Sequence, residues 1–293
     1  MTTAARLSLF ALLLVVVFGG AAVVGRVVDP AGSDAGRAHG AGLDAGPAEH
    51  TADHGVQAES AAAMPAGLAV AQDGYRLVLE RSTYSSGARG HRVAFEIVDH
   101  AGRAVRDFEV EHDKRMHFIV VRRDLQGFQH LHPRLRGDGT WTGRVRFVRG
   151  GAYRVFADFK REGERRTLSA DVQVAGRFRP ERLPRPQRTV RSDGGLDVTL
   201  RAGRLASGSE GRAAFEVRDR GRLVNRRLDR YLGAKGHLVA LRHGDLAYLH
   251  THPEGDELAF GTTYPSAGSY RLFVQFSYNG RIHTAAFTQG VSP

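Results

Sequence analysis

The sequence predicts an all-β protein: tandem, duplicated immunoglobulin-like antiparallel β-sandwiches after an N-terminal transmembrane helix. Three observations lead to this prediction. An apolar run lies near the N-terminus, short segments of alternating polar and apolar residues begin near residue 66, and the second half of that region repeats the first. Alternation rich in Val, Phe and Tyr, interrupted by Gly, Asp and Ser, is typical of strands. A chain of 293 residues is long enough for two domains that each bury a core.

The N-terminal segment, residues 1–28, is predicted to be a signal anchor. Residues 7–25 are apolar and are flanked by Arg6 and Arg26. A helix of that length rises about 28 Å, close to the hydrocarbon thickness of a bilayer. Because Arg6 and the terminal amine favour the inner side, we expect a single-pass protein of the cell membrane whose domains are extracytoplasmic. No convincing Ala-x-Ala cleavage site follows directly. If the segment is nevertheless cleaved, the protein is secreted.

Residues 29–65 are predicted to form a flexible tether, because they are mainly Ala, Gly, Asp and Pro with almost no large apolar side chain. The tether holds His39, His50 and His54. Their loose spacing in an unstructured segment favours a role as solvated side chains over a metal site.

The strand-like pattern divides into two domains, residues 66–176 and 190–293, joined by a linker over residues 177–189. The linker contains three prolines, which cannot lie in a central strand and which stiffen an extended chain. AFEIVD from Ala94 matches AFEVRD from Ala214, and FQHLHP matches YLHTHP at the same offset of 120. Further on, GAYRVF matches GSYRLF at an offset of 117, so the two copies differ by three residues in one loop. This register indicates duplication of a β-sandwich of about 100 residues.

The composition excludes several classes of function. The chain has no cysteine, which excludes disulfides, thiolate metal sites and cysteine nucleophiles. Its net charge of +11 comes almost entirely from arginine. These arginines alternate with acidic residues, and no basic arm or interleaved row of aromatic residues is present, so we expect no nucleic-acid partner. The motifs of serine hydrolases, phosphate-binding loops and zinc proteases are also missing.

Three histidine positions recur in both copies among the fourteen histidines of the chain. They form the unit His-x12-His-x-His-Pro and are predicted to be metal ligands: His117, His130 and His132 in the first domain, and His237, His250 and His252 in the second. HFIVV and FQHLHP should pair as a hairpin, and residues two apart on a strand face the same side. His117 should therefore lie opposite or diagonal to His132, with its imidazole on the face of the other two.

Three neutral imidazoles without a thiolate suit a divalent transition metal, and we expect Cu(II) or Zn(II). Asp158 is a candidate fourth ligand in the first domain, whereas the equivalent Gln275 is a poor ligand. The function that follows is metal sequestration or delivery, without catalysis, by a monomer whose partner is a metal-transport or chaperone protein. In the alternative, the histidines are structural and the protein is an envelope interaction module. In the third interpretation, an open coordination position makes it a metal-dependent enzyme.

The repeats, the FQHLHP and YLHTHP motifs and the GAYRVFADF segment together resemble a group of actinobacterial envelope proteins with tandem β domains. Members of that group are described as heavy-metal-associated or membrane proteins. More remotely, the chain resembles YtkA-like and copper-resistance β-sandwich proteins. The resemblance covers residues 66–293 and implies metal handling in the envelope, with copper as the expected metal. The chain has only three methionines, unlike the Met-rich copper-resistance sandwiches.

Overall fold

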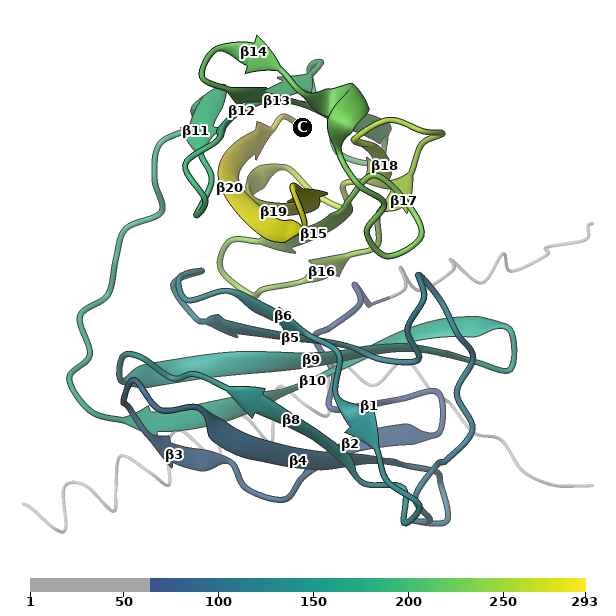
Figure 1. Ribbon diagram of the computed structural model, residues 1–293. Helices are drawn as coiled ribbons and strands as arrows, with labels where there is room; N and C mark the ends of the chain where they lie inside the picture. The colour runs from purple at the N-terminus through teal and green to yellow at the C-terminus, as the bar shows by residue number, and fades with distance from the viewer. Residues whose placement is uncertain (1–63) are drawn as a thin grey trace, which may run out of the picture. The chain divides into compact units, whose positions relative to one another are not determined.

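The computed structural model describes residues 64–293, and this part of the chain is built from strands and one short 3-10 helix, η1 (Asn225–Arg227). The predicted all-β class and tandem arrangement are confirmed, with β1–β10 in the first repeat and β11–β20 in the second (Figure 1). The predicted signal anchor and nearly all of the predicted tether lie outside the described residues. Within residues 64–293, no helix has the length and apolar character needed to cross a membrane.

The first repeat consists of two five-stranded sheets, which we call outer and inner. The outer sheet has the order β1 (Ala71–Gln72), β2 (Tyr75–Leu79), β4 (His91–Val98), β8 (Trp141–Val145) and β7 (Arg134–Leu135). The inner sheet has the order β3 (Thr83–Ser85), β10 (Glu164–Ala175), β9 (Gly151–Arg161), β5 (His117–Arg122) and β6 (Gln129–Leu131). The strands pair antiparallel, except that β3 runs parallel to β10.

The second repeat has the same two-layer plan. Its outer sheet has the order β11 (Thr189–Arg191), β12 (Asp197–Ala202), β13 (Glu210–Asp219), β18 (Ala259–Thr263) and β17 (His252–Pro253), and β14 (Arg222–Leu223) pairs with β13. Its inner sheet has the order β16 (Tyr248–Leu249), β15 (His237–Arg242), β19 (Gly268–Tyr278) and β20 (Arg281–Val291).

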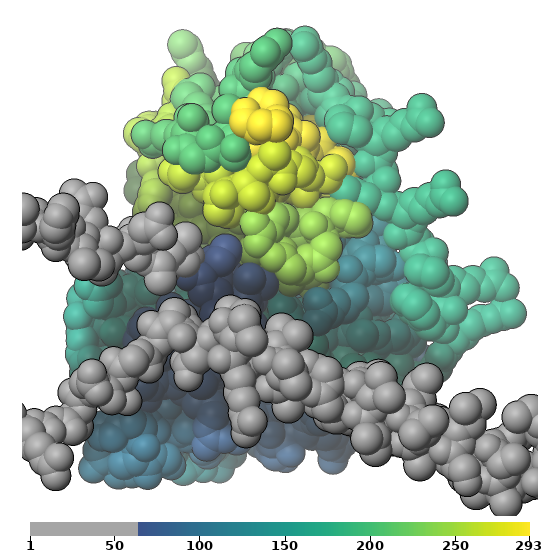
Figure 2. All heavy atoms as spheres, turned by 180° about the vertical axis from the view of Figure 1, so that it is seen from behind, coloured from purple at the N-terminus to yellow at the C-terminus, as the bar shows by residue number. Residues whose placement is uncertain are grey.

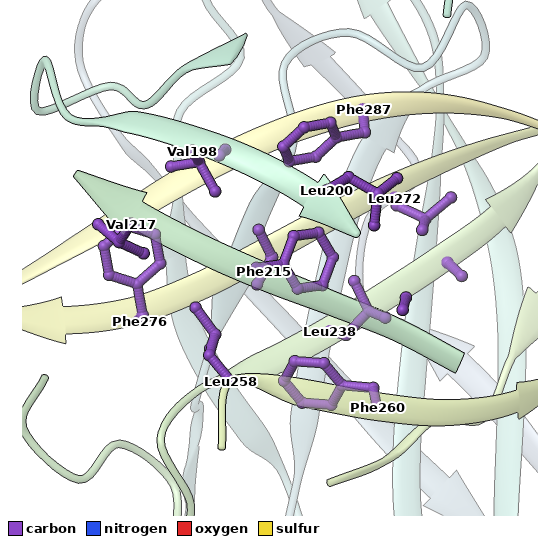
Figure 3. Close-up of a cluster of buried hydrophobic side chains, with 14 of the residues drawn as sticks. Val198, Leu200, Phe215, Val217, Leu238, Leu258, Phe260, Leu272, Phe276 and Phe287 are labelled. Carbon is purple, nitrogen blue, oxygen red and sulfur yellow. The ribbon is translucent and has the colours of Figure 1, made fainter. Parts of the chain in front are cut away.

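Each repeat has its own hydrophobic core between its two sheets. In the second repeat, Phe215 of the outer sheet and Phe287 of the inner sheet point into this space, with ring centroids 5.5 Å apart (Figure 3). In the first repeat, Phe95 stacks on Phe118 at 4.6 Å. Buried residues alternate with more exposed ones along β13 of the outer sheet, as expected for a sheet with one face in solvent.

The inner sheets are covered on both faces. All six residues of β5 are buried, and so are all residues of β15 except Arg242. An antiparallel sheet with one face in water would expose alternate residues, so a second layer must cover these strands. That layer is the inner sheet of the other repeat: Ile119 and Val121 share a buried cluster with Val239 and Leu241. The two repeats therefore share a third hydrophobic core.

The contacts between the repeats are reciprocal. Phe128 of the first repeat stacks on Phe273 of the second, with ring centroids 4.1 Å apart. Tyr248, the equivalent of Phe128, contacts Phe156, the equivalent of Phe273, at 5.6 Å. Equivalent residues thus exchange partners, as they do across a two-fold interface. Residues near the axis of such an arrangement meet their own counterparts.

Candidate metal centre

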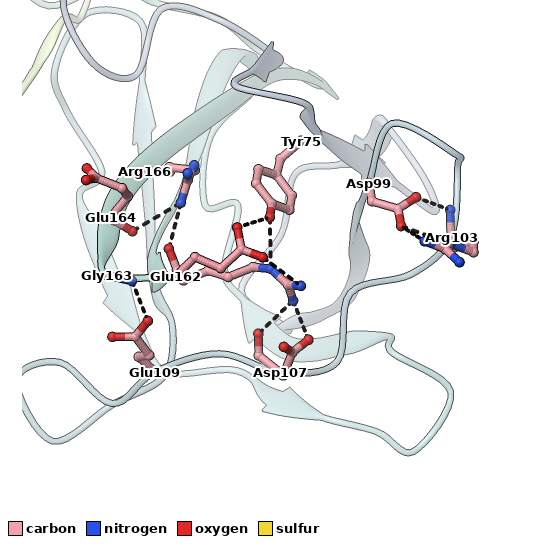
Figure 4. A network of polar contacts seen from close by, with 10 residues as sticks. Tyr75, Asp99, Arg103, Asp107, Glu109, Glu162, Gly163, Glu164 and Arg166 are labelled. Carbon is pink, nitrogen blue, oxygen red and sulfur yellow. Dashed lines mark hydrogen bonds and ion pairs between the residues drawn. The ribbon is translucent and has the colours of Figure 1, made fainter.

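The loop that precedes β5 is fixed to the β9–β10 hairpin. Three acidic residues of the loop, spaced two apart, bond to the hairpin: Asp107 to Arg161, Glu109 to the Gly163 amide, and Glu111 to Arg165. Figure 4 shows Asp107 and Glu109 in this network, with Tyr75 donating to Glu162 beside them. The clamp holds the backbone carbonyl of Glu111 next to the first residue of β5.

His117 begins β5 and is only 3% exposed. Its Nε2 lies 3.1 Å from the carbonyl oxygen of Glu111. A carbonyl oxygen only accepts hydrogen bonds, so this nitrogen carries the proton and Nδ1 keeps its lone pair. Nδ1 faces Nε2 of His130 at 3.0 Å. The loop therefore orients His117 so that an unprotonated nitrogen points toward a second imidazole.

His130 lies on β6, and a residue of the other repeat sets its orientation. Its Nδ1 is 2.7 Å from Oε1 of Gln275 on β19. The amide nitrogen of Gln275 donates to Thr284 at 3.2 Å, which leaves its oxygen as the acceptor for His130. His130 Nδ1 consequently carries the proton, and its Nε2 has a free lone pair directed at His117.

His237 is the counterpart of His117 in the second repeat, and the two rings stack with centroids 5.2 Å apart and an interplanar angle of 6°. Its ring centroid lies 4.8 Å from that of His130. His237 is 9% exposed, and its buried Nε2 has no hydrogen-bond partner in the described part of the chain. His117, His130 and His237 each offer a nitrogen, and these three atoms lie within 4.8 Å of one another.

Two more histidines adjoin this trio. The ring of His132 lies 4.7 Å from that of His130 and 5.1 Å from that of His117, and its buried Nε2 has no partner among the described residues. His112 lies on the loop before β5, 5.8 Å from His237, with a left-handed φ of 48°. A non-glycine residue in that region costs energy and often marks a functional site.

His250 and His252 lie outside this cluster, which differs from the predicted second site. β16 ends at Leu249, and the Thr251 hydroxyl donates a hydrogen bond to the backbone carbonyl of Leu238 at 2.7 Å. The chain then crosses to the outer sheet, where His252 is exposed and His250 points at the first repeat. The structure does bring together the rings of the three histidines predicted as ligands in the first repeat, His117, His130 and His132. His237 of the second repeat lies beside them.

Asp158, the candidate fourth ligand, lies opposite His117 in the β5–β9 ladder. Its carboxylate accepts a hydrogen bond from Thr167 at 2.9 Å and lies 3.9 Å from Nδ1 of His250. Gln275 occupies the equivalent place beside His130, so the two pairs are reciprocal across the interface. Sequence reasoning missed Gln275 as a partner of His130, and it missed His112. The signal that could have revealed these contacts is the run of consecutive apolar residues in HFIVV and HLVAL, which is typical of strands covered on both faces.

Burial keeps the imidazoles of the cluster neutral. It lowers the pKa of His117, and it holds the pKa values of His130 and His237 well below the ordinary histidine value. Burial, assisted by His117, lowers the pKa of His132 to about 4. Neutral imidazole is the form that binds metal ions, so these ligands need to lose no proton at neutral pH.

Similar solved structures include Escherichia coli alpha-2-macroglobulin activated by porcine elastase (13% identity, TM-score 0.26, 75% of this chain and 20% of that chain). Another is Yersinia pseudotuberculosis InvD (12% identity, TM-score 0.26, 76% and 58%). The FN1–FN3 domains of chicken CNTN1 also match (10% identity, TM-score 0.23, 78% and 69%). The chain spans about a fifth of the macroglobulin's length. Likeness at these scores carries no functional argument, and no curated protein matches the chain. The resemblance to actinobacterial envelope proteins, and to YtkA-like and copper-resistance β-sandwich proteins, stays a prediction.

One family model matches residues 69–176 and again residues 188–293. These segments contain the two β-sandwiches and together make up more than half of the chain. The family is described as a domain of unknown function, which assigns no activity. The chain belongs to this family, DUF8832, and carries two copies of its domain.

Proposed function

We propose that this protein binds one divalent transition metal ion, Cu(II) or Zn(II), between its two repeats and holds it for sequestration or delivery. The ligands are His117, His130 and His237, and His132 is the nearest candidate for a fourth. The proposal replaces two sites per chain, one in each repeat, with a single shared site. It is a proposal for a binding protein rather than an enzyme.

One observation carries the proposal. His117 Nδ1 and His130 Nε2 face each other at 3.0 Å, while the other nitrogen of each ring donates to an oxygen. In the neutral rings, both facing nitrogens have lone pairs and neither has a proton to share. With these tautomers the two lone pairs repel each other, and a proton or a metal ion between them would relieve the repulsion. Burial lowers the pKa of both histidines, so the rings are neutral and able to act as metal ligands.

The distance between the facing nitrogens of His117 and His130 fits a metal ion. A tetrahedral ion with bonds of about 2.0–2.1 Å separates two nitrogen ligands by about 3.3 Å. Right-angled coordination at a similar bond length separates them by about 2.8 Å. The observed 3.0 Å between His117 and His130 lies between these values. His237 adds a buried nitrogen without a partner, as a ligand would have before the ion binds.

We propose that the site lies on the outer side of a membrane, because the apolar residues 7–25 predict a signal anchor. In this proposal the protein acts as a single-pass monomer and exchanges its metal with a metal-transport or chaperone protein. Nucleic acid is not a partner in this proposal.

The competing function is an interaction module whose histidines only pack the repeats together. The parallel stacking of His117 on His237 favours it, because such contacts also occur in dry interfaces. It leaves unexplained the facing lone pairs and the unpartnered nitrogens of His132 and His237.

Metal titration of the full chain tests the proposal. The protein should first carry His39, His50 and His54 as alanine, so that tether histidines add no background. Competition against a chromophoric chelator should show one tight equivalent of Cu(II) or Zn(II). His130→Ala should weaken this binding on the order of 10²–10³-fold, whereas His243→Ala, which removes a histidine outside the cluster, should not.

Retention of the fold separates the two functions. If His130→Ala loses the metal but keeps its thermal unfolding midpoint, the histidine is a ligand. If the wild-type protein binds no ion more tightly than a few micromolar, the metal site is disproved. If His130→Ala then also unfolds, the histidine has a structural role, as the interaction module requires.

A further inference from the structure

The linker between β10 and β11 carries a regular row of basic residues. Four arginines recur every third residue, and we call them the arginine row: Arg179, Arg182, Arg185 and Arg188. Three prolines lie among them and force extended backbone on themselves and on the residue before each. In a polyproline II chain, three residues make one turn and rise about 9 Å. Such a chain projects the arginine row from one side, with one guanidinium about every 9 Å.

The first half of the linker is held against the body of the protein. The ring of Phe178 lies 5.6 Å from the guanidinium carbon of Arg122. The amide nitrogen of Glu181 donates to Asp124 at 2.9 Å. Leu183 packs against the hydrophobic core that the two repeats share. These anchors order the backbone in advance, so a ligand would not bear the full entropic cost of ordering it.

The arginine row is exposed, and within residues 64–293 none of its side chains forms an ion pair or a hydrogen bond. The one acidic residue of the linker, Glu181, is directed at Arg149 and Arg122 and does not neutralise the row. Figure 2 shows long side chains in the teal green of the linker projecting from the surface. Beside the start of the row, Arg177 and Arg179 line a hollow with Arg149, Val148 and Ser86.

We propose that the arginine row docks a flexible linear polymer that carries phosphate charges and no bases. Guanidinium groups match phosphate oxygens in a two-pronged geometry, and regularly spaced guanidinium groups suit a single flexible strand that can follow them. The linker contains a single aromatic residue, Phe178. A surface that stacks nucleic-acid bases needs several aromatic rings. The surface is independent of the metal centre, and its function does not require the metal.

Binding of long-chain inorganic polyphosphate to the full chain, followed by fluorescence anisotropy, tests this inference. Four guanidinium contacts should give a slope of log affinity against log salt of about −3. Changing Arg179, Arg182, Arg185 and Arg188 to Gln should weaken binding at least tenfold and bring the slope close to zero. The matched control removes the same charge elsewhere, at four exposed arginines without ion pairs in the described chain: Arg89, Arg204, Arg222 and Arg281. It should bind within threefold of wild type.

Equal losses in the row variant and the control variant would overturn the proposal, because net charge alone would then explain binding. Unchanged binding by the row variant would overturn it as well. Tighter binding of single-stranded oligo(dT) than of polyphosphate at equal salt would replace the proposed polymer with a nucleic acid. Equal thermal midpoints of both variants and wild type show that these comparisons concern binding and not folding.

Discussion

Replacing His237 by alanine removes the single ring that the second repeat contributes to the His117–His130–His237 trio. Structural zinc sites bind with about 10–16 kcal/mol, so each of four ligands contributes about 2.5–4 kcal/mol. Loss of one ligand should therefore weaken metal binding on the order of 10²–10³-fold. Two independent sites would respond differently, since His237→Ala would then leave the site of the first repeat at full affinity.

Competition titration of wild type, His237→Ala and His252→Ala measures this difference. His252 is exposed and lies outside the cluster, so His252→Ala should bind metal as the wild type does. The reasoning is refuted if His237→Ala retains one equivalent at wild-type affinity. It is also refuted if His252→Ala loses as much affinity as His237→Ala.

Three further predictions concern the surroundings of the site. Gln275→Leu removes the hydrogen-bond acceptor of His130 Nδ1 and should weaken metal binding about 10–100-fold. Gln275→Glu keeps an acceptor and should bind metal more tightly than Gln275→Leu. Equal affinities of these two variants in the chelator assay would disprove the role of Gln275. Burial raises the pKa of Asp158 from 3.8 to about 6, so the stability of the metal-free protein falls as the pH rises from about 4 to about 6, and above pH 6 the full loss of about 3 kcal/mol is present. Asp158→Asn should therefore be more stable than wild type in urea at pH 8 and no more stable at pH 4, and an equal gain at both pH values would contradict this. Phe273→Ala removes a ring that is 3% exposed and stacks on Phe128, and it should destabilise the protein by about 3–5 kcal/mol. The control Val148→Ala, at an exposed position, should destabilise the protein by less than about 0.5 kcal/mol. Similar urea midpoints of the two variants would show that the core shared by the repeats contributes little to stability.

Local pattern was sufficient to predict the strands and the hairpin of the first repeat. β5 pairs with β6 so that Phe118 lies opposite Leu131, and this register places His117 across from His132. Both predictions rest on period-two alternation and short-range pairing, which are properties of adjacent segments. The match between the repeats likewise predicted the tandem arrangement that the structure shows.

The histidines of the metal site come together through contacts between the two repeats. Such contacts cannot be predicted from the alternation of polar and apolar residues along one strand. The reciprocal interface brings His237 to His117 and Gln275 to His130. The two repeats also differ locally at one equivalent position: Leu131 pairs with Phe118 in the β5–β6 ladder, whereas the hydroxyl of Thr251 donates a hydrogen bond to the carbonyl of Leu238. Side-chain hydrogen bonds of Ser and Thr compete with sheet ladders in this way.

Anomalous diffraction from crystals of the Cu(II)- or Zn(II)-loaded protein tests the shared metal site most directly. We predict one peak at the metal edge, about 2.0–2.1 Å from His117 Nδ1, His130 Nε2 and a ring nitrogen of His237. Two peaks, one in each repeat, or a single peak at His250 and His252 with none between His117 and His130, would contradict the account.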